Sequence, residues 1–181
     1  MASISPDGKM VAWSVRKGET YEIHLSGVSD SSKDVIIRPA EGGSACSSDA
    51  PVWSPDGRSL AYASDCTAEG SRQPQIFVWS KQMGASQQIT HVTGTIDDIA
   101  WSPDGKQIGF LFVENATRAA GALDAMKPWS GVIGEDGVEV QRIAIANLSD
   151  KSVQQVTPEN LHIYEYSWAP DSKELAYVAA N

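Results

Sequence analysis

A ten-residue phrase recurs four times in this chain of 181 residues. The copies are ISPDGKMVAW at 4–13, WSPDGRSLAY at 53–62, WSPDGKQIGF at 101–110 and WAPDSKELAY at 168–177. Their prolines, Pro6, Pro55, Pro103 and Pro170, lie 49, 48 and 67 residues apart. A repeat of this length corresponds to one supersecondary unit that must stack on its neighbours to bury its apolar surface, so it constrains the fold strongly.

Each copy predicts a tight turn between two strands. Proline presets φ for the first turn position, aspartate bonds its own following backbone, and glycine accepts positive φ. The turn residues are Pro6, Asp7 and Gly8; Pro55, Asp56 and Gly57; Pro103, Asp104 and Gly105; and Pro170 and Asp171. An aromatic residue precedes three of the turns, at Trp53, Trp101 and Trp168. Its recurrence at one repeat position favours a place in the core over a ligand platform.

The strand after each turn alternates in side-chain size. Its large residues are Val11 and Trp13, Leu60 and Tyr62, Ile108 and Phe110, and Leu175 and Tyr177. Alanine or glycine lies between the two members of each pair. Because strand side chains point alternately to opposite faces, each sheet is predicted to have one large face and one small face. Such sheets are suited to close stacking.

The remaining segments complete an all-β prediction. Third strands are predicted at 21–28, 75–80 and 140–148, and fourth strands at 34–39, 86–90 and 152–157. The pattern indicates a partial β-propeller of about 3.5 four-stranded antiparallel blades within one domain, 1–181. The blades are predicted at 1–45, 46–93, 94–160 and, incomplete, 161–181. An insertion at about 114–139, with a helix predicted at 116–126, lengthens the third blade.

Composition excludes several classes of function. With 23 acidic and 14 basic residues the net charge is −9, which argues against a nucleic-acid partner. The chain has no uncharged apolar run of the ~18 residues that a membrane-spanning helix needs, and MASISPDGKM is not an export signal. No cofactor is predicted. No metal site is predicted either, because single turn aspartates spaced about 48 residues apart do not form a calcium cage.

The two cysteines of the chain are placed symmetrically. Cys46 and Cys66 each lie ten residues from Asp56, and residues equidistant from a hairpin turn face each other. One interpretation is a disulfide, which implies an oxidising compartment such as the periplasm or the exterior. The other is a pair of unrelated free thiols, which leaves a cytoplasmic location open.

The insertion is the best candidate for a functional segment, because long loops on rigid scaffolds often carry binding sites. Its candidate binding residues are Glu114, Arg118, Asp124, Trp129, Glu135, Asp136 and Glu139. Acidic side chains could hold a peptide amino terminus, and Arg118 could meet a carboxylate. The alternatives are packing against a further domain or partner subunit, and a solvated loop with a tucked Trp129.

The repeated phrase resembles the TolB-type repeat, which occurs in TolB and in the propellers of the prolyl-oligopeptidase family of serine peptidases. Residues 110–148 are similar to a segment of bacterial members related to dipeptidyl and acylaminoacyl peptidases. In that family the propeller lies over a C-terminal α/β-hydrolase domain and limits the access of large substrates. The resemblance implies the same gating role here, with a peptide substrate and a hydrolase domain as partners.

The catalytic residues of that family have no counterpart in this sequence. A nucleophile elbow needs Gly-x-Ser-x-Gly, and the nearest segment, KPWSG at 127–131, begins with lysine. The chain itself is therefore predicted to be non-catalytic. The competing prediction is a TolB-like module that binds a protein partner. Three and a half blades do not close a ring, so pairing of two copies through open blade edges is a further expectation.

Overall fold

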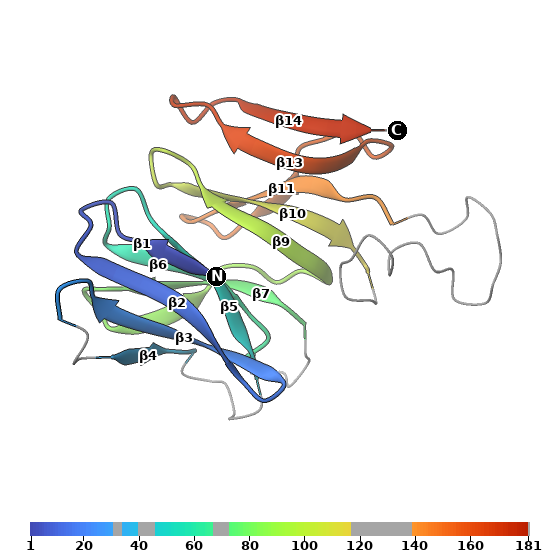
Figure 1. Cartoon of the computed structure of the whole chain (residues 1–181). Helices are drawn as coiled ribbons and strands as arrows, with labels where there is room; N and C mark the ends of the chain where they lie inside the picture. Colours follow the sequence, from blue (N-terminus) through green and yellow to red (C-terminus); the bar gives the residue numbers. More distant parts are fainter. Residues whose placement is uncertain (31–33, 40–45, 67–72, 117–138, 181) are drawn as a thin grey trace.

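The computed structural model describes residues 1–30, 34–39, 46–66, 73–116 and 139–180. These residues contain strands and turns but no helix, which confirms the all-β prediction for the described part of the chain. Their strands form three four-stranded sheets and one two-stranded sheet, stacked one after another (Figure 1). The helix predicted at 116–126 lies outside the described residues except for residue 116.

Each sheet is an antiparallel meander of consecutive strands. The first contains β1 (Ala2–Ile4), β2 (Met10–Lys17), β3 (Thr20–Gly27) and β4 (Val35–Ile37). The second contains β5 (Ser48–Trp53), β6 (Ser59–Ser64), β7 (Gln75–Ser80) and β8 (Ala85–Gln88). The third contains β9 (Gly94–Trp101), β10 (Gln107–Glu114), β11 (Arg142–Asn147) and β12 (Val153–Gln155), and the fourth β13 (His162–Trp168) and β14 (Leu175–Ala180).

The repeated turns use a serine as well as the predicted Pro-Asp-Gly. Ser54 donates its hydroxyl hydrogen to Asp56 Oδ1 at 2.6 Å and accepts the Ser59 amide at 2.9 Å. Asp56 also accepts the Arg58 amide, and these two hydrogen bonds lower the pKa of its carboxyl group. Gly57 has φ 67°, whereas the fourth copy reaches φ 63° with Ser172. The left-handed position of the turn is therefore occupied by glycine in three copies and by serine in the fourth.

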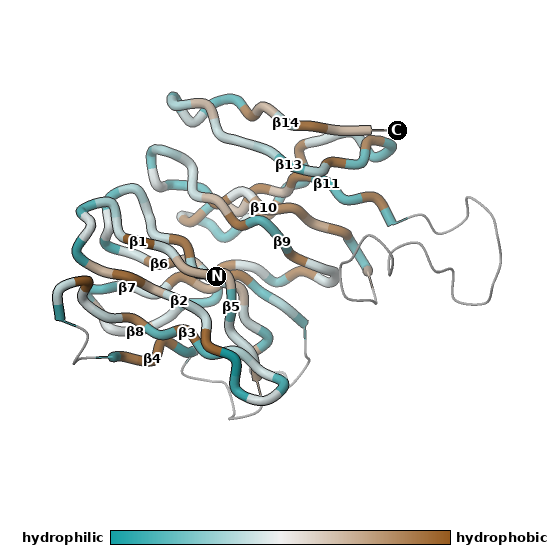
Figure 2. The backbone as a smooth tube through the Cα atoms, viewed as in Figure 1, coloured by the Kyte–Doolittle hydropathy of each residue, from teal (hydrophilic) through white to brown (hydrophobic). Residues whose placement is uncertain are grey.

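The large face of each sheet packs on the small face of the sheet before it. Leu60 and Tyr62 of β6 lie in one core cluster with Ala12 and Ile23 of the first sheet. A second cluster repeats this arrangement between the next two sheets, with Ile108, Phe110, Ala61 and Ile76. Burying each large side chain contributes about 1.5–3 kcal/mol. The core is thus divided into layers between sheets, and Figure 2 shows apolar segments along the facing strands.

Tryptophans also connect successive sheets by hydrogen bonds. Trp101 Nε1 donates to the Val52 carbonyl at 3.0 Å, and Trp168 Nε1 donates to the Ala100 carbonyl at 3.3 Å. Trp53 and Trp101 are buried, and Trp168 is half-buried. These side chains therefore belong to the contacts between sheets.

Two sheet faces are not covered by another sheet within the described part of the chain. On the first sheet the large face is open, and Ile4 and Ile36 are 64% and 41% exposed. On the fourth sheet the small face is open, and Val178 is 52% exposed. The stacking that buries the core thus ends in two complementary surfaces.

Candidate functional site

Acidic residues form bulges in the first strands of the second and third sheets. These strands contact each other, and β5 also contacts β1. The register shifts after Asp49 in β5 and around Asp98 in β9, where Ala50 and Asp98 have φ of 53° and 46°. Each bulge begins with an aspartate that accepts the next amide hydrogen, at 2.6 Å for Asp49 and 2.8 Å for Asp97. The bulges therefore place carboxylates at equivalent points of adjacent strands.

The bulge in β9 is part of a cluster of negative charge. Burial raises the pKa of the Asp98 carboxyl group, and the nearby charges of Asp97 and Glu165 raise it further. The Tyr166 hydroxyl donates to the Asp98 carbonyl at 2.8 Å, which holds β13 against this bulge. A cation at this position would relieve the repulsion between the carboxylates. We missed this cluster from the sequence, although the doubled aspartate interrupts the apolar alternation of the strand.

A second acidic region lies where the insertion leaves and rejoins the third sheet. This region is a shallow depression with a volume of about 580 Å³. The residues that line it include Glu114, Glu139, Arg142, Gln155 and Glu159. Gln155 Nε2 donates to Glu114 Oε2 at 2.8 Å and so fixes that carboxylate on β10. Three carboxylates around one guanidinium leave this depression with negative charge.

Arg142 is a further residue that sequence reasoning missed. Its Nε donates to the Thr157 carbonyl at 2.9 Å, and its Nη2 donates to the same oxygen. The Thr157 hydroxyl in turn accepts the Ile143 amide at 3.1 Å. In the second sheet Thr90 accepts the Ile76 amide in the same way, but a neutral Gln75 stands where Arg142 stands here. The charged Arg142 therefore occupies a position that is neutral in the second sheet, and this difference becomes visible when the two sheets are compared.

The structure describes two of the seven predicted binding residues of the insertion. It brings Glu114 and Glu139 together at the depression. The other five lie outside the described residues: Arg118, Asp124, Trp129, Glu135 and Asp136.

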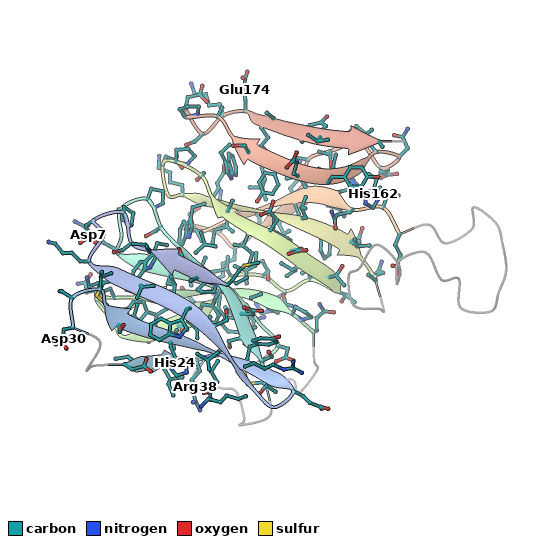
Figure 3. All side chains as sticks on the ribbon, viewed as in Figure 1. Asp7, His24, Asp30, Arg38, His162 and Glu174 are labelled. Atoms are coloured by element: carbon teal, nitrogen blue, oxygen red, sulfur yellow. A yellow bond between two sulfur atoms is a disulfide. The ribbon has the colours of Figure 1, made fainter. Side chains whose placement is uncertain are left out.

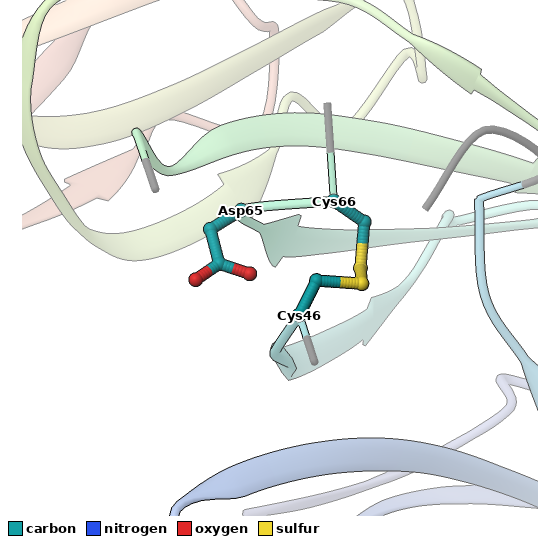
Figure 4. Close-up of side chains that lie close together, drawn as sticks. All are labelled: Cys46, Asp65 and Cys66. Carbon is teal, nitrogen blue, oxygen red and sulfur yellow. A yellow bond between two sulfur atoms is a disulfide. The ribbon is translucent and has the colours of Figure 1, made fainter. Parts of the chain in front are cut away.

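Cys46 and Cys66 form a disulfide, with their Cα atoms 5.0 Å apart (Figure 4). The bond joins the segment before β5 to the segment after β6. Beside it, Asp65 Oδ1 accepts the Ser47 amide at 2.5 Å. Because the two sulfurs are bonded to each other and carry no thiolate, the disulfide closes the hairpin structurally and does not supply metal ligands.

His24 on β3 is paired with a carboxylate, as in many catalytic sites. Its Nδ1 lies 2.6 Å from Asp34 Oδ2, and Glu22 is ion-paired with Arg38 at 3.1 Å. Figure 3 labels His24 and Arg38 on the first sheet. The Nε2 of His24 is buried and accepts or donates no hydrogen bond within the described residues. A serine nucleophile would have to stand at Nε2. The described residues therefore place an Asp–His pair on the first sheet, and none of them supplies a hydroxyl hydrogen-bonded to Nε2.

The stacked antiparallel meanders, each with the repeated turn between its first two strands, define a β-propeller fold of the TolB type. Crystal structures of two proteins of this kind show the likeness. TolB from Acinetobacter baumannii superposes with a TM-score of 0.60 at 21% identity, over 96% of this chain and 36% of that one. The acylaminoacyl peptidase of Pyrococcus horikoshii superposes with a TM-score of 0.61 at 14% identity, over 91% of this chain and 26% of that one.

Sequence comparison adds one curated relative. The protein named uncharacterized peptidase YuxL of Bacillus subtilis (strain 168) is 36% identical over 58 residues, which are 32% of this chain and 8% of the relative. The match thus spans a small part of that peptidase. No protein-family model matches the chain. Among the described residues, no helix has the length and apolar character needed to cross a membrane.

Proposed function

We propose that this chain is the non-catalytic propeller portion of a serine peptidase of the prolyl-oligopeptidase family. The observation that carries the proposal is the joint occurrence of the TolB-type fold and a 36% identical match to a peptidase. The same fold occurs in an acylaminoacyl peptidase.

The proposed role is to select the peptides that reach a catalytic domain. Carboxylates at the β9 bulge and at the root of the insertion supply negative charge on a chain whose net charge is −9. Such charge attracts the protonated amino terminus of a peptide and repels acidic segments. The uncovered face of the first or fourth sheet would supply the apolar surface for domain contacts.

The reading frame after the codon for Asn181 in the source genome tests this proposal. An in-frame α/β-hydrolase domain with Gly-x-Ser-x-Gly supports it, and a stop codon contradicts it. Peptide binding by the purified chain tests the role. A peptide with a free amino terminus should bind more tightly than its acetylated form, and equal binding would contradict selection by the carboxylates.

A TolB-like interaction module is the second candidate function. It is favoured by the TolB structure from Acinetobacter baumannii, whose likeness extends over 96% of this chain. In this case the chain would bind a folded protein partner, and the neighbouring genes would encode envelope proteins. Association with such a partner, in a chain followed by a stop codon, would favour this function over the first.

We further propose that the protein works in an oxidising compartment, such as the periplasm or the exterior. The Cys46–Cys66 disulfide supports this, because such bonds persist mainly outside the reducing cytosol. Alkylation of thiols in cells before lysis tests it. Protection of both cysteines from alkylation is expected, and rapid labelling of both would contradict the proposal.

A further inference from the structure

Three side chains with metal-binding atoms meet where the β5–β6 hairpin opens. The sulfurs of Cys46 and Cys66 and a carboxylate oxygen of Asp65 all lie within 4.8 Å of one another (Figure 4). In the disulfide the two sulfurs are bonded to each other and do not act as ligands. A reduced pair would present two thiols, and thiolate sulfur is a preferred ligand of Zn²⁺. The chemistry of this group therefore depends on its redox state.

Hydrogen bonds hold the two cysteines together independently of the disulfide. The Ser47 amide donates to Asp65 Oδ1 at 2.5 Å, and the Ser47 carbonyl accepts the Asp65 amide at 3.1 Å. The same carbonyl accepts the Ser64 hydroxyl at 2.9 Å. Ser47 is adjacent to Cys46, and Asp65 is adjacent to Cys66. Breaking the S–S bond therefore leaves the two cysteines side by side, in positions that the hairpin sets.

The surroundings of the reduced pair favour a bound cation. The Ser47 amide orients the Asp65 carboxylate, as the groups around metal ligands commonly do. The Ser48 hydroxyl lies 3.8 Å from Cys66 Sγ, where it can donate to a thiolate. Cys66 is only 3% exposed, and a buried thiolate beside a carboxylate is unfavourable without a compensating positive charge. A divalent cation supplies that charge.

We propose that reduction of the Cys46–Cys66 disulfide converts this end of the hairpin into a site for Zn²⁺ or another divalent cation that prefers sulfur. A dithiol reductant supplies two electrons and two protons: the S–S bond breaks, two S–H bonds form, and the reductant becomes a disulfide. Zn²⁺ then displaces the two thiol protons and binds both sulfurs and the Asp65 carboxylate, with water in the fourth position. Exchange with a small-molecule disulfide re-forms the S–S bond and releases the metal ion.

The proposed site separates two classes of cation and two sets of conditions. Mg²⁺ and Ca²⁺ prefer ligand sets made of oxygen, so they should not compete with Zn²⁺ for two thiolates. In an oxidising compartment the disulfide prevails, so the metal-bound form belongs to reducing conditions. The site does not depend on the proposed peptidase role.

Co²⁺ binding to the full chain tests this inference, because cobalt–thiolate bonds absorb in the near ultraviolet by charge transfer. The chain is reduced with dithiothreitol, which is then removed by gel filtration without oxygen. The reduced chain should show this absorption, and added Zn²⁺ should abolish it by displacing Co²⁺. The oxidised chain and the double variant Cys46→Ser, Cys66→Ser should not show it. A reduced chain without this absorption would overturn the inference.

A carboxylate variant tests whether Asp65 is a ligand. Asp65→Asn should weaken Co²⁺ binding at least about tenfold. Asparagine keeps an oxygen for the Ser47 amide but loses the negative charge, so the hairpin should retain its fold. Asp150→Asn is the matched control, because Asp150 is exposed in the turn between β11 and β12 and should leave the affinity unchanged. Equal affinities of the two variants would overturn the assignment of Asp65 as a ligand.

Thermal denaturation shows whether the metal ion binds the folded hairpin. Excess Zn²⁺ should raise the Tm of the reduced chain, because a ligand that binds only the folded state stabilises it. The Tm of the oxidised chain should not change. If Zn²⁺ leaves the Tm of the reduced chain unchanged or lowers it, the site is not formed by the fold and the inference is wrong.

Discussion

The indole nitrogen of Trp101 donates a hydrogen bond to the carbonyl oxygen of Val52, 3.0 Å away, and so connects the first strands of two successive sheets. Trp168 makes the corresponding bond to Ala100 one sheet later. The same aromatic side chain that precedes the repeated turn therefore also sets the position of one sheet on the next. Sheet stacking depends on this hydrogen bond as well as on apolar burial.

Trp101→Phe should lower the free energy of unfolding by about 1–3 kcal/mol. The substitution leaves the Val52 carbonyl without its donor and removes part of a buried ring, and both effects are destabilising. Urea denaturation followed by circular dichroism measures the change. Trp168→Phe is the matched control: its side chain is half-buried and its hydrogen bond longer, so a smaller loss is expected. An equal loss of unfolding free energy in the two variants would show that burial and hydrogen-bond length do not set the contribution of these tryptophans.

Gly109→Val should loosen the fourth sheet from the third. A Cβ at Gly109 would lie 3.0 Å from the Tyr166 ring and 3.2 Å from Trp168 Nε1, so a branched side chain must displace both aromatics. Faster hydrogen exchange of the β13 and β14 amides is expected. Ala176→Val is the control at the equivalent position of the fourth sheet, where the small face is exposed. If both variants exchange like the unchanged chain, Gly109 is not required for this contact.

The double variant Cys46→Ser, Cys66→Ser should be less stable than the unchanged chain by ~3 kcal/mol. The reason is that a disulfide closing a loop of this size restricts the unfolded chain and so lowers its conformational entropy. The two residues are 20 apart in the sequence, and the bond closes the β5–β6 hairpin. Thermal denaturation with and without dithiothreitol measures the effect. Reductant should lower the Tm of the unchanged chain but not that of the double variant. An unchanged Tm on reduction would show that the bond does not stabilise the fold.

Asp56→Asn should destabilise the chain at pH 7 but not in acid. The hydrogen bonds from Ser54 and Arg58 lower the folded-state pKa of Asp56 below its ordinary value of 3.8. Its contribution to stability is therefore present above that value and is lost as the pH falls through the lowered pKa. Urea denaturation at pH 7 and at a series of pH values descending below 3.8 tests this. A difference between variant and unchanged chain that persists in acid would contradict it.

Asp98→Asn should raise the free energy of unfolding at pH 7, which is the opposite of the effect expected for Asp56→Asn. The folded-state pKa of Asp98 is raised by burial and by Asp97 and Glu165, so its ionised form opposes folding. That penalty is absent below the ordinary value of 3.8 and develops as the pH rises through the raised pKa. Asparagine also accepts the positive φ of 46°. The stabilisation should disappear in acid, and a loss of stability at pH 7 would refute the electrostatic explanation.

The repeat alone was sufficient to predict the stacked meanders, because turn chemistry and alternation are local properties of consecutive residues. The strand predicted at 75–80 coincides with β7, and the others differ from the observed bounds by a few residues at their ends. The large and small faces were likewise predictable from the residues that flank Ala61 and Gly109, since strand geometry sends neighbouring side chains to opposite faces.

Which charged side chains come together was not predictable from local patterns. Asp98 becomes part of an acidic cluster because a bulge turns β9 and the next sheet brings Glu165 to it from 67 residues away. Arg142 acquires its place because Thr157 lies across the sheet, where its carbonyl oxygen accepts the hydrogen bonds from the guanidinium group. Local sequence is thus sufficient to specify the repeating unit. Contacts between units specify the candidate sites, because those contacts join residues that local patterns do not relate.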